Sequence, residues 1–429
     1  MVNANDFNGL TDIDVIEAAV KGRGSDGIVV ISERKSKIEA ERNYWLIDRA
    51  ILLPENTTVL LENCKIKLSD KCRDNFFRSA NSGIGIAFPE RIKNIHIKGI
   101  GSCLLEGADH PRAVGDGSKI LANPCSYEKE DIIKYAHWVP EERKKSGKLT
   151  FSDRHDYSYG TDCDKEGETP KGDWRGIGIL FANVEDFSIE NVSLKDYHCW
   201  GISLEECACG KVSGINFDAR MYKEIDGMRH NMENQDGVDI RNGCHDILIS
   251  DITGNTGDDL VALTAIARKR EFKPGGSLGY THVMHNDWTK REKDIYNITL
   301  RNIVGTSSLC MLLRFLSAEA NIYNVVADGI IDTTPDDLRK GGTILIGEPD
   351  EAYGTVYPDS TRNIIINNVI SNRCRAIMIR GYLSDSVISN IVNKNPDTPA
   401  IYVERKDCIK NVTVGCINDA SGKGVVNEE

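Results

Sequence analysis

The segment HDILISDITGNTGDDLVAL (245–263) carries the pattern on which the interpretation of the whole chain depends. Apolar and polar residues alternate in it, an Asp or Asn marks each bend, and β-branched residues follow. This module returns with a loose period on the order of 20 to 30 residues, which is the signature of a repeat architecture. It recurs as NIHIKGIGSCLLEG (94–107), VEDFSIENVSLKDYHCWGISLEE (184–206), GKVSGINF (210–217), IYNITLRNIVGTSSLCMLLRF (295–315), ANIYNVVADGIID (320–332), RNIIINNVISNRCRAIMIRG (362–381), SDSVISNIV (384–392) and CIKNVTVGCI (408–417).

This repeat predicts the fold class. Alternation with period two indicates short strands, and no helical pattern of any length lies between them, which excludes a doubly wound fold. Tight Asn-Gly turns are few, so a sandwich of hairpins is not favoured either. We therefore expect an all-β chain whose residues 1–429 form a single parallel β-solenoid domain. Its coils should stack at the ordinary strand spacing of about 4.8 Å.

Three segments depart from the repeat. Residues 8–22 have a helical pattern, with Thr11 or Asp12 as the N-cap and an apolar face that ends at a glycine, so we expect a helix that caps the solenoid. Residues 110–174 and 267–293 are rich in charge and aromatic side chains. The outward side chains of one sheet of the solenoid should form a long groove. We expect these two segments to be long loop insertions that flank this groove, because long loops in compact folds usually serve function.

Composition limits the classes of partner. The net charge of −12 argues against nucleic acid, whose phosphates require a basic surface. No stretch approaches the roughly 20 apolar residues of a membrane span. The 13 cysteines show no paired spacing, so we expect buried thiols and no metal or cofactor. The acidic start lacks the features of a signal peptide, which predicts a cytoplasmic protein, or a secreted one if the start has been trimmed. The oligomeric state stays open.

The acids near the middle of the chain are the candidate catalytic residues. Asp236 and Asp258 are 22 residues apart, about one coil, and Asp259 follows directly. Carboxyl groups stacked in this way repel one another, so at least one pKa should rise and leave a protonated acid beside ionised bases. Cleavage of a glycosidic bond requires that division of roles. Simple Asx turns and a calcium site are the alternative interpretations.

Two of these segments resemble a known family. ENQDGVDI and TGDDLVAL are similar to the Asn-x-Asp-Gly-x-Asp and Gly-Asp-Asp-x-Val-Ala signatures of the polygalacturonase family, glycoside hydrolase family 28. The preceding segment DYHCWGISLEECACGKVSGINF resembles the Trp-containing coil of that family. The resemblance is close over about residues 190–265 and loose over most of the rest.

The resemblance implies a right-handed parallel β-helix and hydrolysis with inversion. By this resemblance Asp258 would be the general acid, and Asp236 and Asp259 would hold and activate the water. Asn234 would line the substrate site, and Asp239 would brace the adjoining bend. An oligosaccharide is the implied partner.

Two later signatures of the family are missing. Gly-His-Gly should fall one coil after the Gly-Asp-Asp, where the chain has Leu309 or Cys310. One coil further, Thr343 and Leu345 stand where the family has the Arg-x-Lys pair that holds the substrate carboxylate. The parts for cleavage are therefore present, while the parts that hold a uronic acid are not.

Other residues could take over these roles. The loop with His282 and His285 could supply an imidazole, and Arg314 or Arg380 could supply charge from neighbouring coils. Without such replacements the substrate would be a different, neutral sugar. Arg314 lies in an apolar strand and should have a carboxylate partner or a ligand. Trp200 and Tyr197 could each stack on a sugar ring or pack in the core.

Three functions follow from this pattern. The first is an inverting glycoside hydrolase that acts on the ends of a pectin-related or other plant or microbial glycan. The second is a carbohydrate-binding β-solenoid without catalysis. The third is a β-helical uronate lyase or epimerase. The sugar, the linkage and the choice between endo and exo action stay open.

Overall fold

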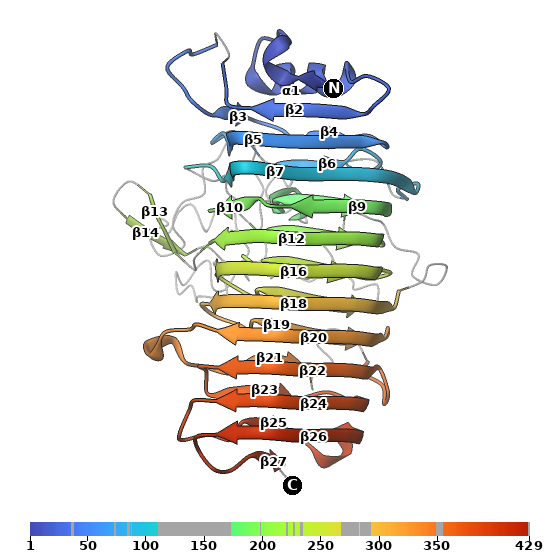
Figure 1. The fold of residues 1–429 in the computed structure, drawn as a ribbon, viewed down its shortest axis with the longest axis vertical. Helices are drawn as coiled ribbons and strands as arrows, with labels where there is room; N and C mark the ends of the chain where they lie inside the picture. Colours follow the sequence, from blue (N-terminus) through green and yellow to red (C-terminus); the bar gives the residue numbers. More distant parts are fainter. Residues whose placement is uncertain are drawn as a thin grey trace, which may run out of the picture.

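Successive repeats form the coils of a right-handed parallel β-helix in the computed structural model (Figure 1). The predicted fold class is therefore confirmed, with strands that pair in parallel from coil to coil. The structure describes residues 1–35, 38–72, 74–83, 86, 88–109, 173–197, 199–219, 222–225, 228–231, 235–266, 283, 293–348 and 355–427.

The described strands form two large sheets, which we call sheet A and sheet B. Sheet A consists of β1 (Val2–Asn3), β2 (Ile28–Ser32), β5 (Thr57–Leu68), β7 (Ile92–Glu106), β10 (Ser193–Lys195), β12 (Ala208–Asp218), β16 (His245–Thr256), β18 (Ile295–Ser307), β20 (Ile322–Asp332), β22 (Thr361–Ser371), β24 (Leu383–Asn393) and β26 (Ile409–Asp419), with β3 (Trp45–Ile47) and β9 (Val184–Glu190) paired beside this path. Sheet B consists of β4 (Ile51–Leu53), β6 (Phe77–Ser79), β8 (Ile179–Ala182), β11 (Ile202–Glu205), β15 (Val238–Arg241), β17 (Val261–Ile266), β19 (Leu313–Ala318), β21 (Gly342–Ile346), β23 (Arg375–Ile379), β25 (Ile401–Val403) and β27 (Val425–Asn427).

The core is a set of apolar columns that run along the solenoid. In sheet B, Val238 pairs with Val261, which pairs with Leu313, and the column continues through Ile344 and Ile377. All five side chains are completely buried. Each such burial stabilises the fold by about 1.5–3 kcal/mol, so a periodic apolar sequence fixes the register of every coil.

Bends inside the long strands of sheet A use Asn and Asp in the left-handed region. Asp251 and Asn302 have φ values of 57° and 54°, and the Asn302 side-chain amide donates to Asp251 over 2.9 Å. Asn324 in turn donates to Asn297 over 3.0 Å. Asn and Asp accept positive φ at little cost, so these residues mark the corners where the sequence placed its bends.

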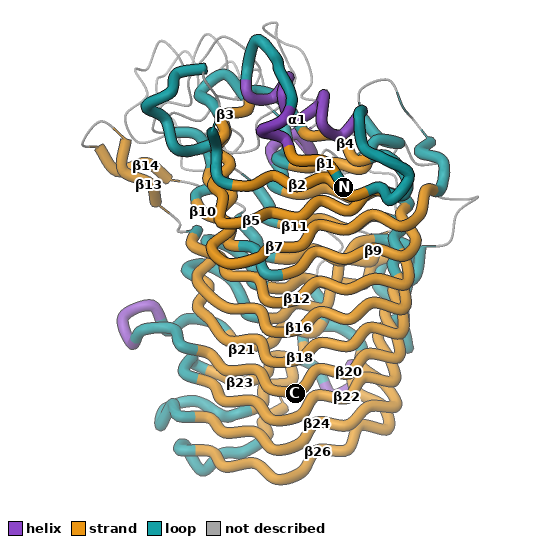
Figure 2. Tube along the Cα trace, turned by 45° about the horizontal axis from the view of Figure 1, so that its top comes forward, coloured by secondary structure: helices purple, strands orange, loops and turns teal. Residues whose placement is uncertain are grey.

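The helix α1 (Asp12–Lys21) covers the N-terminal end of the solenoid (Figures 1 and 2). Thr11 is its N-cap, with an extended backbone, and exchanges hydrogen bonds with Asp14 in a capping box. The helix is therefore shorter than the predicted range 8–22, because the chain before the cap is not helical. No helix in the described part of the chain is long and apolar enough to cross a bilayer.

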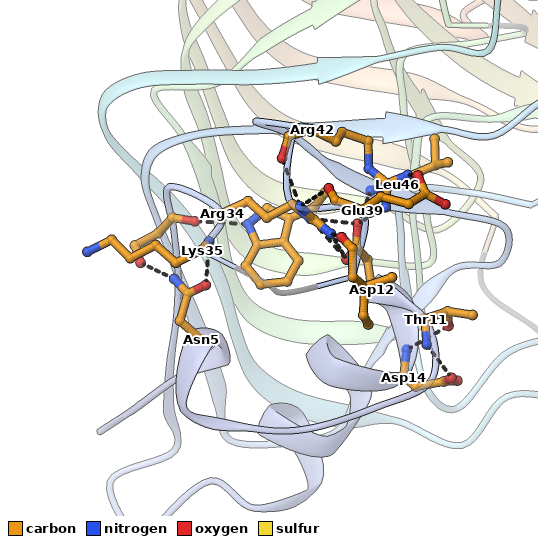
Figure 3. A network of polar contacts seen from close by, with 12 residues as sticks. Asn5, Thr11, Asp12, Asp14, Arg34, Lys35, Glu39, Arg42 and Leu46 are labelled. Atoms are coloured by element: carbon orange, nitrogen blue, oxygen red, sulfur yellow. Dashed lines mark hydrogen bonds and ion pairs between the residues drawn. The ribbon is translucent and has the colours of Figure 1, made fainter.

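A buried ion-pair network ties α1 to the first coil (Figure 3). Asp12, at the start of the helix, is 1% exposed. Its carboxylate accepts from Arg34 at 2.9 Å, from Arg42 at 2.8 Å and from the amide of Leu46 at 2.9 Å. A buried carboxylate needs such partners, so this network fixes how the cap meets the stack.

Short elements interrupt the coils. The strands β13 (Tyr222–Ile225) and β14 (Met228–Asn231) form an antiparallel hairpin that projects from the side of the solenoid (Figure 2). The 3-10 helices are η1 (Ala4–Asp6), η3 (Asp173–Gly176), η5 (Asp336–Leu338) and η7 (Lys406–Cys408). The predicted loops 110–174 and 267–293 lie outside the described residues, except for 173–174, which begin η3, and for 283 and 293.

Candidate active site

The acids of the site precede two neighbouring strands of sheet B. Val238 of β15 pairs with Val261 of β17, so the repeat here is 23 residues rather than the expected 22. In this register Asp236 lies one coil from Asp259, and Asp258 lies diagonally opposite. The expectation that Asp236 would stack on Asp258 was therefore wrong by one residue, although the same carboxyl groups meet.

These carboxyl groups are buried to different degrees. Asp236, Asp239 and Asp259 are 6%, 1% and 3% exposed, whereas Asp258 is only half-buried. We call these four residues the acid cluster. Asp258 is the member of this cluster that is most open to a ligand.

Burial and mutual repulsion raise the pKa of three members. Burial is the largest cause of the rise in the pKa of Asp236 and Asp239 well above the usual value, and the charges of neighbouring carboxyl groups add to it. Burial also raises the pKa of Asp259 to about 6, against the opposing effect of Arg314. The sequence suggested repulsion as the cause, but removal from water is the larger effect. Asp236, Asp239 and Asp259 therefore keep their protons to a higher pH than ordinary carboxyl groups do.

The adjacent carboxyl groups of Asp258 and Asp259 have different hydrogen-bond partners. The amide of Asp259 donates to the Asp258 carboxylate over 3.0 Å, and the Thr256 hydroxyl donates to the Asp258 carbonyl over 2.7 Å. The Asp259 carboxylate accepts from the amide of Met311 over 2.9 Å and lies 3.6 Å from the Arg314 guanidinium. Positive and hydrogen-bonding partners thus stabilise the ionised form of Asp259.

Cys310 stands beside these acids on the next coil. Its Sγ and one carboxylate oxygen each from Asp258 and Asp259 lie within 4.8 Å of one another. That spacing would suit a metal ion, but burial and the two nearby charges raise the pKa of the thiol. Metal binding would first have to remove that proton. Cys310, one of the two residues expected at the histidine position, therefore has a neutral thiol.

A buried ion pair supports the turn that carries Cys310. The amide of Cys310 donates to the Ser307 hydroxyl over 3.0 Å, and the Ser307 carbonyl accepts from Arg373. Arg373 pairs with Asp332 at 3.0 Å, with both side chains almost completely buried. The same Asp332 accepts from the Thr343 hydroxyl over 2.7 Å. These contacts fix the coil next to the acid cluster.

Two arginines and a glutamate form a chain of ion pairs that begins beside the acid cluster. Arg314 lies 2.9 Å from Glu348, and Glu348 lies 3.0 Å from Arg380. Arg380 also pairs with Glu404 at 2.7 Å. The expectation that Arg314 has a carboxylate partner is confirmed, and it has two, Glu348 and Asp259. We call Arg314, Glu348 and Arg380 the bridged wall.

The positions of the missing Arg-x-Lys pair are buried on the outer face of β21, because they alternate with Ile344 of the core column. Leu345 is 1% exposed, and Thr343 is completely buried. Arg314 pairs with Leu345 across β19 and β21, so its guanidinium comes from one coil earlier than the family pair would.

Several polar atoms around the cluster are buried without a hydrogen-bond partner among the described residues. They include the hydroxyls of Tyr197 and Ser203, the side-chain carbonyl of Gln235 and one carboxyl oxygen of Asp239. Burial is the largest cause of the raised pKa of Tyr197, and the charges of Asp236 and Asp239 add to it, so these groups share one region. Such atoms are costly in a folded protein and are characteristic of functional sites.

The aromatic residues of the coil before the cluster are packed. Trp200 is 3% exposed, and the Arg241 guanidinium lies 4.7 Å from its ring. Tyr197 is completely buried and meets Phe217 edge to face, with ring centroids 5.8 Å apart. For both residues the burial favours core packing over stacking on a sugar.

Some expected residues lie outside the described part of the chain, namely Asn234, His282 and His285. Sequence reasoning missed Glu348 and Gln235, which carry no motif. It also missed the β13–β14 hairpin, although the Asp-Gly dipeptide at 226–227 is a hairpin signal.

Comparison with known proteins adds solved structures only, since no family model and no curated protein sequence matches the chain. The polygalacturonase from Erwinia carotovora ssp. carotovora is similar with a TM-score of 0.53 at 16% identity, covering 100% of this chain and 96% of that one. The exopolygalacturonase from Thermotoga maritima has a TM-score of 0.52 at 14% identity, covering 97% and 92%. These likenesses show the fold.

A third similar structure has another role. The tailspike protein of Escherichia coli bacteriophage HK620, solved in complex with a pentasaccharide, has a TM-score of 0.56 at 11% identity, covering 100% of this chain and 63% of that one. At such low identity the shared feature is the right-handed parallel β-helix. The function must therefore be argued from the site itself.

Proposed function

We propose that this protein is an inverting glycoside hydrolase that removes sugars from the end of an oligosaccharide. The observation that carries the proposal is the acid cluster, in which two adjacent coils bring four carboxyl groups together and the pKa of three of them is raised. Glycosidic cleavage needs a protonated and an ionised carboxyl group at the same bond. Solved polygalacturonases with the same fold support it.

The geometry suggests a role for each acid. Asp258 is half-buried and can reach a ligand, so it donates the proton to the glycosidic oxygen as that bond breaks. Asp259, with a pKa of about 6 and with Arg314 beside it, is mainly ionised at pH 7 and accepts the proton of the attacking water. Asp236, one coil away, holds that water with it. Because the carboxyl groups interact, their protons belong to the cluster as a whole.

The second candidate is a carbohydrate-binding solenoid without catalysis. The neutral thiol of Cys310, in the place where the resembling family has an imidazole, favours this alternative. The positions of the Arg-x-Lys pair also offer no cation, because the uncharged and buried Thr343 and Leu345 stand there. Both candidates predict glycan binding, and only the first predicts turnover.

Turnover on a panel of plant and microbial oligosaccharides tests the proposal. We expect release of reducing ends from at least one member, with single sugars as the early product of exo action. The activity should persist in a chelator and should give no unsaturated product that absorbs in the ultraviolet, which separates hydrolysis from a calcium-dependent lyase reaction. Binding of a glycan without any release of reducing ends would favour the second candidate.

A further inference from the structure

The bridged wall has an arrangement that bears on the charge of the substrate. A single carboxylate, Glu348, contacts both guanidinium groups, Arg314 at 2.9 Å and Arg380 at 3.0 Å. Its side chain is 14% exposed, so the bridge is largely removed from water. Ion pairs in such surroundings are screened less than those on an open surface.

The wall lies close to the reacting groups. Asp239 pairs with Ala262, and Ala262 pairs with Arg314, so Arg314 is two coils from Asp239 in the same column. Its guanidinium also lies 3.6 Å from Asp259. A sugar that reaches Asp258 therefore meets Arg314 as the nearest described cation of this column.

The charge balance at this point is acidic. The two guanidinium groups of the wall face three carboxyl groups, those of Asp259, Glu348 and Glu404. A carboxylate on the substrate would have to displace Glu348 from Arg314 and would approach carboxyl groups of its own sign. A hydroxymethyl group at the same position meets neither obstacle.

We propose that the sugar bound over the acid cluster is uncharged, and that Glu348 sets this specificity by occupying Arg314 and Arg380. Glu348 acts as a specificity-determining residue that makes an acidic substrate unfavourable. The turnover measurements of this inference rest on the proposed function, whereas its binding measurements do not.

A matched pair of ligands tests the proposal. One member is a set of short oligogalacturonides; the other is the same set after chemical reduction of every carboxylate to a hydroxymethyl group, which preserves ring and linkage. We expect the wild-type protein to favour the reduced set at least tenfold in kcat/KM at low salt. Replacing Glu348 by Gln removes the carboxylate that the two guanidinium groups share, and Glu348→Gln should move this ratio at least tenfold toward the acidic set.

Glu404→Gln is the matched control, because it removes a partner of Arg380 and leaves Glu348 on Arg314. Its ratio should change less than twofold. A wild-type preference for the acidic set, or an unchanged ratio in a folded Glu348→Gln variant, would overturn the inference.

Calorimetry with the Asp258→Asn variant separates this inference from the proposed function. Tighter binding of the reduced set supports an uncharged substrate even if no variant shows turnover, in which case only the proposed hydrolysis fails. Equal or tighter binding of the acidic set, or binding of neither set, overturns the inference whatever the turnover.

Discussion

Asp258→Asn should lower kcat by about 10²–10⁴-fold, the range that a positioned general acid contributes. An amide cannot donate the proton that the leaving oxygen needs. The melting temperature should stay unchanged, because the side chain is half-buried and an Asn carbonyl can still accept the 3.0 Å hydrogen bond from the amide of Asp259. Steady-state kinetics and calorimetric melting of the same preparation give both values.

The matched control for this variant is Asp251→Asn. Asp251 lies at an exposed bend of β16 in sheet A, where it accepts from Asn302. The control should keep wild-type kcat. Full activity in Asp258→Asn would remove Asp258 from the mechanism, and an equal loss in the control would point to a general effect on folding.

Asp236→Asn should lose activity and gain stability at the same time. Burial raises the pKa of Asp236 well above its ordinary value of 3.8. A carboxyl group whose pKa is higher in the folded state favours folding when protonated, and that contribution is lost as the pH rises through the folded pKa. Asn cannot ionise, so the variant should be more stable than wild type at about pH 8, where each pKa unit of the shift corresponds to about 1.4 kcal/mol.

The pH dependence identifies the cause of that gain. The difference from wild type should shrink as the pH falls and vanish below about pH 3, where Asp236 is mainly protonated in both states. Asp246→Asn is the control, because hydrogen bonds from His245 and Asn297 lower the pKa of that exposed carboxyl group. It should give no gain at pH 8. Denaturant unfolding at several pH values measures both variants, and a gain that does not depend on pH would contradict a buried ionisable group.

The fold could be predicted because its determinants are local and repeated. Each coil reuses the same alternation of apolar residues, and the corners use Asn or Asp at positive φ, as Asn302 and Asn324 do. Thr11 before an apolar helical pattern was sufficient to place the capping helix. Such signals need no knowledge of distant contacts.

The site could be predicted only in part, because its details depend on register and on contacts between coils. A repeat of 23 residues places Asp236 over Asp259, and no local signal separates 22 from 23. The contacts of Glu348 could not be predicted from the sequence, because they depend on the stacking that brings Arg314 and Arg380 beside its carboxylate. Trp200 illustrates the same limit, since its ring is covered by Arg241, which lies one coil away.

Departures from the family signatures were visible in the sequence, but their replacements were not. Cys310 was one of two residues expected at the histidine position, and the structure places its thiol with Asp258 and Asp259. Arg314 lies one coil earlier than the missing pair, and its guanidinium pairs with Glu348. Both outcomes depend on which side chains the stacking of coils brings together.

The most direct test of the account is the anomeric configuration of the first product. Proton NMR should follow the wild-type protein acting on the best oligosaccharide of the panel, before the released sugar mutarotates. A single activated water, held by Asp236 and Asp259, predicts that the new reducing sugar first appears with the configuration opposite to that of the bond cleaved. A first product of retained configuration would contradict the account.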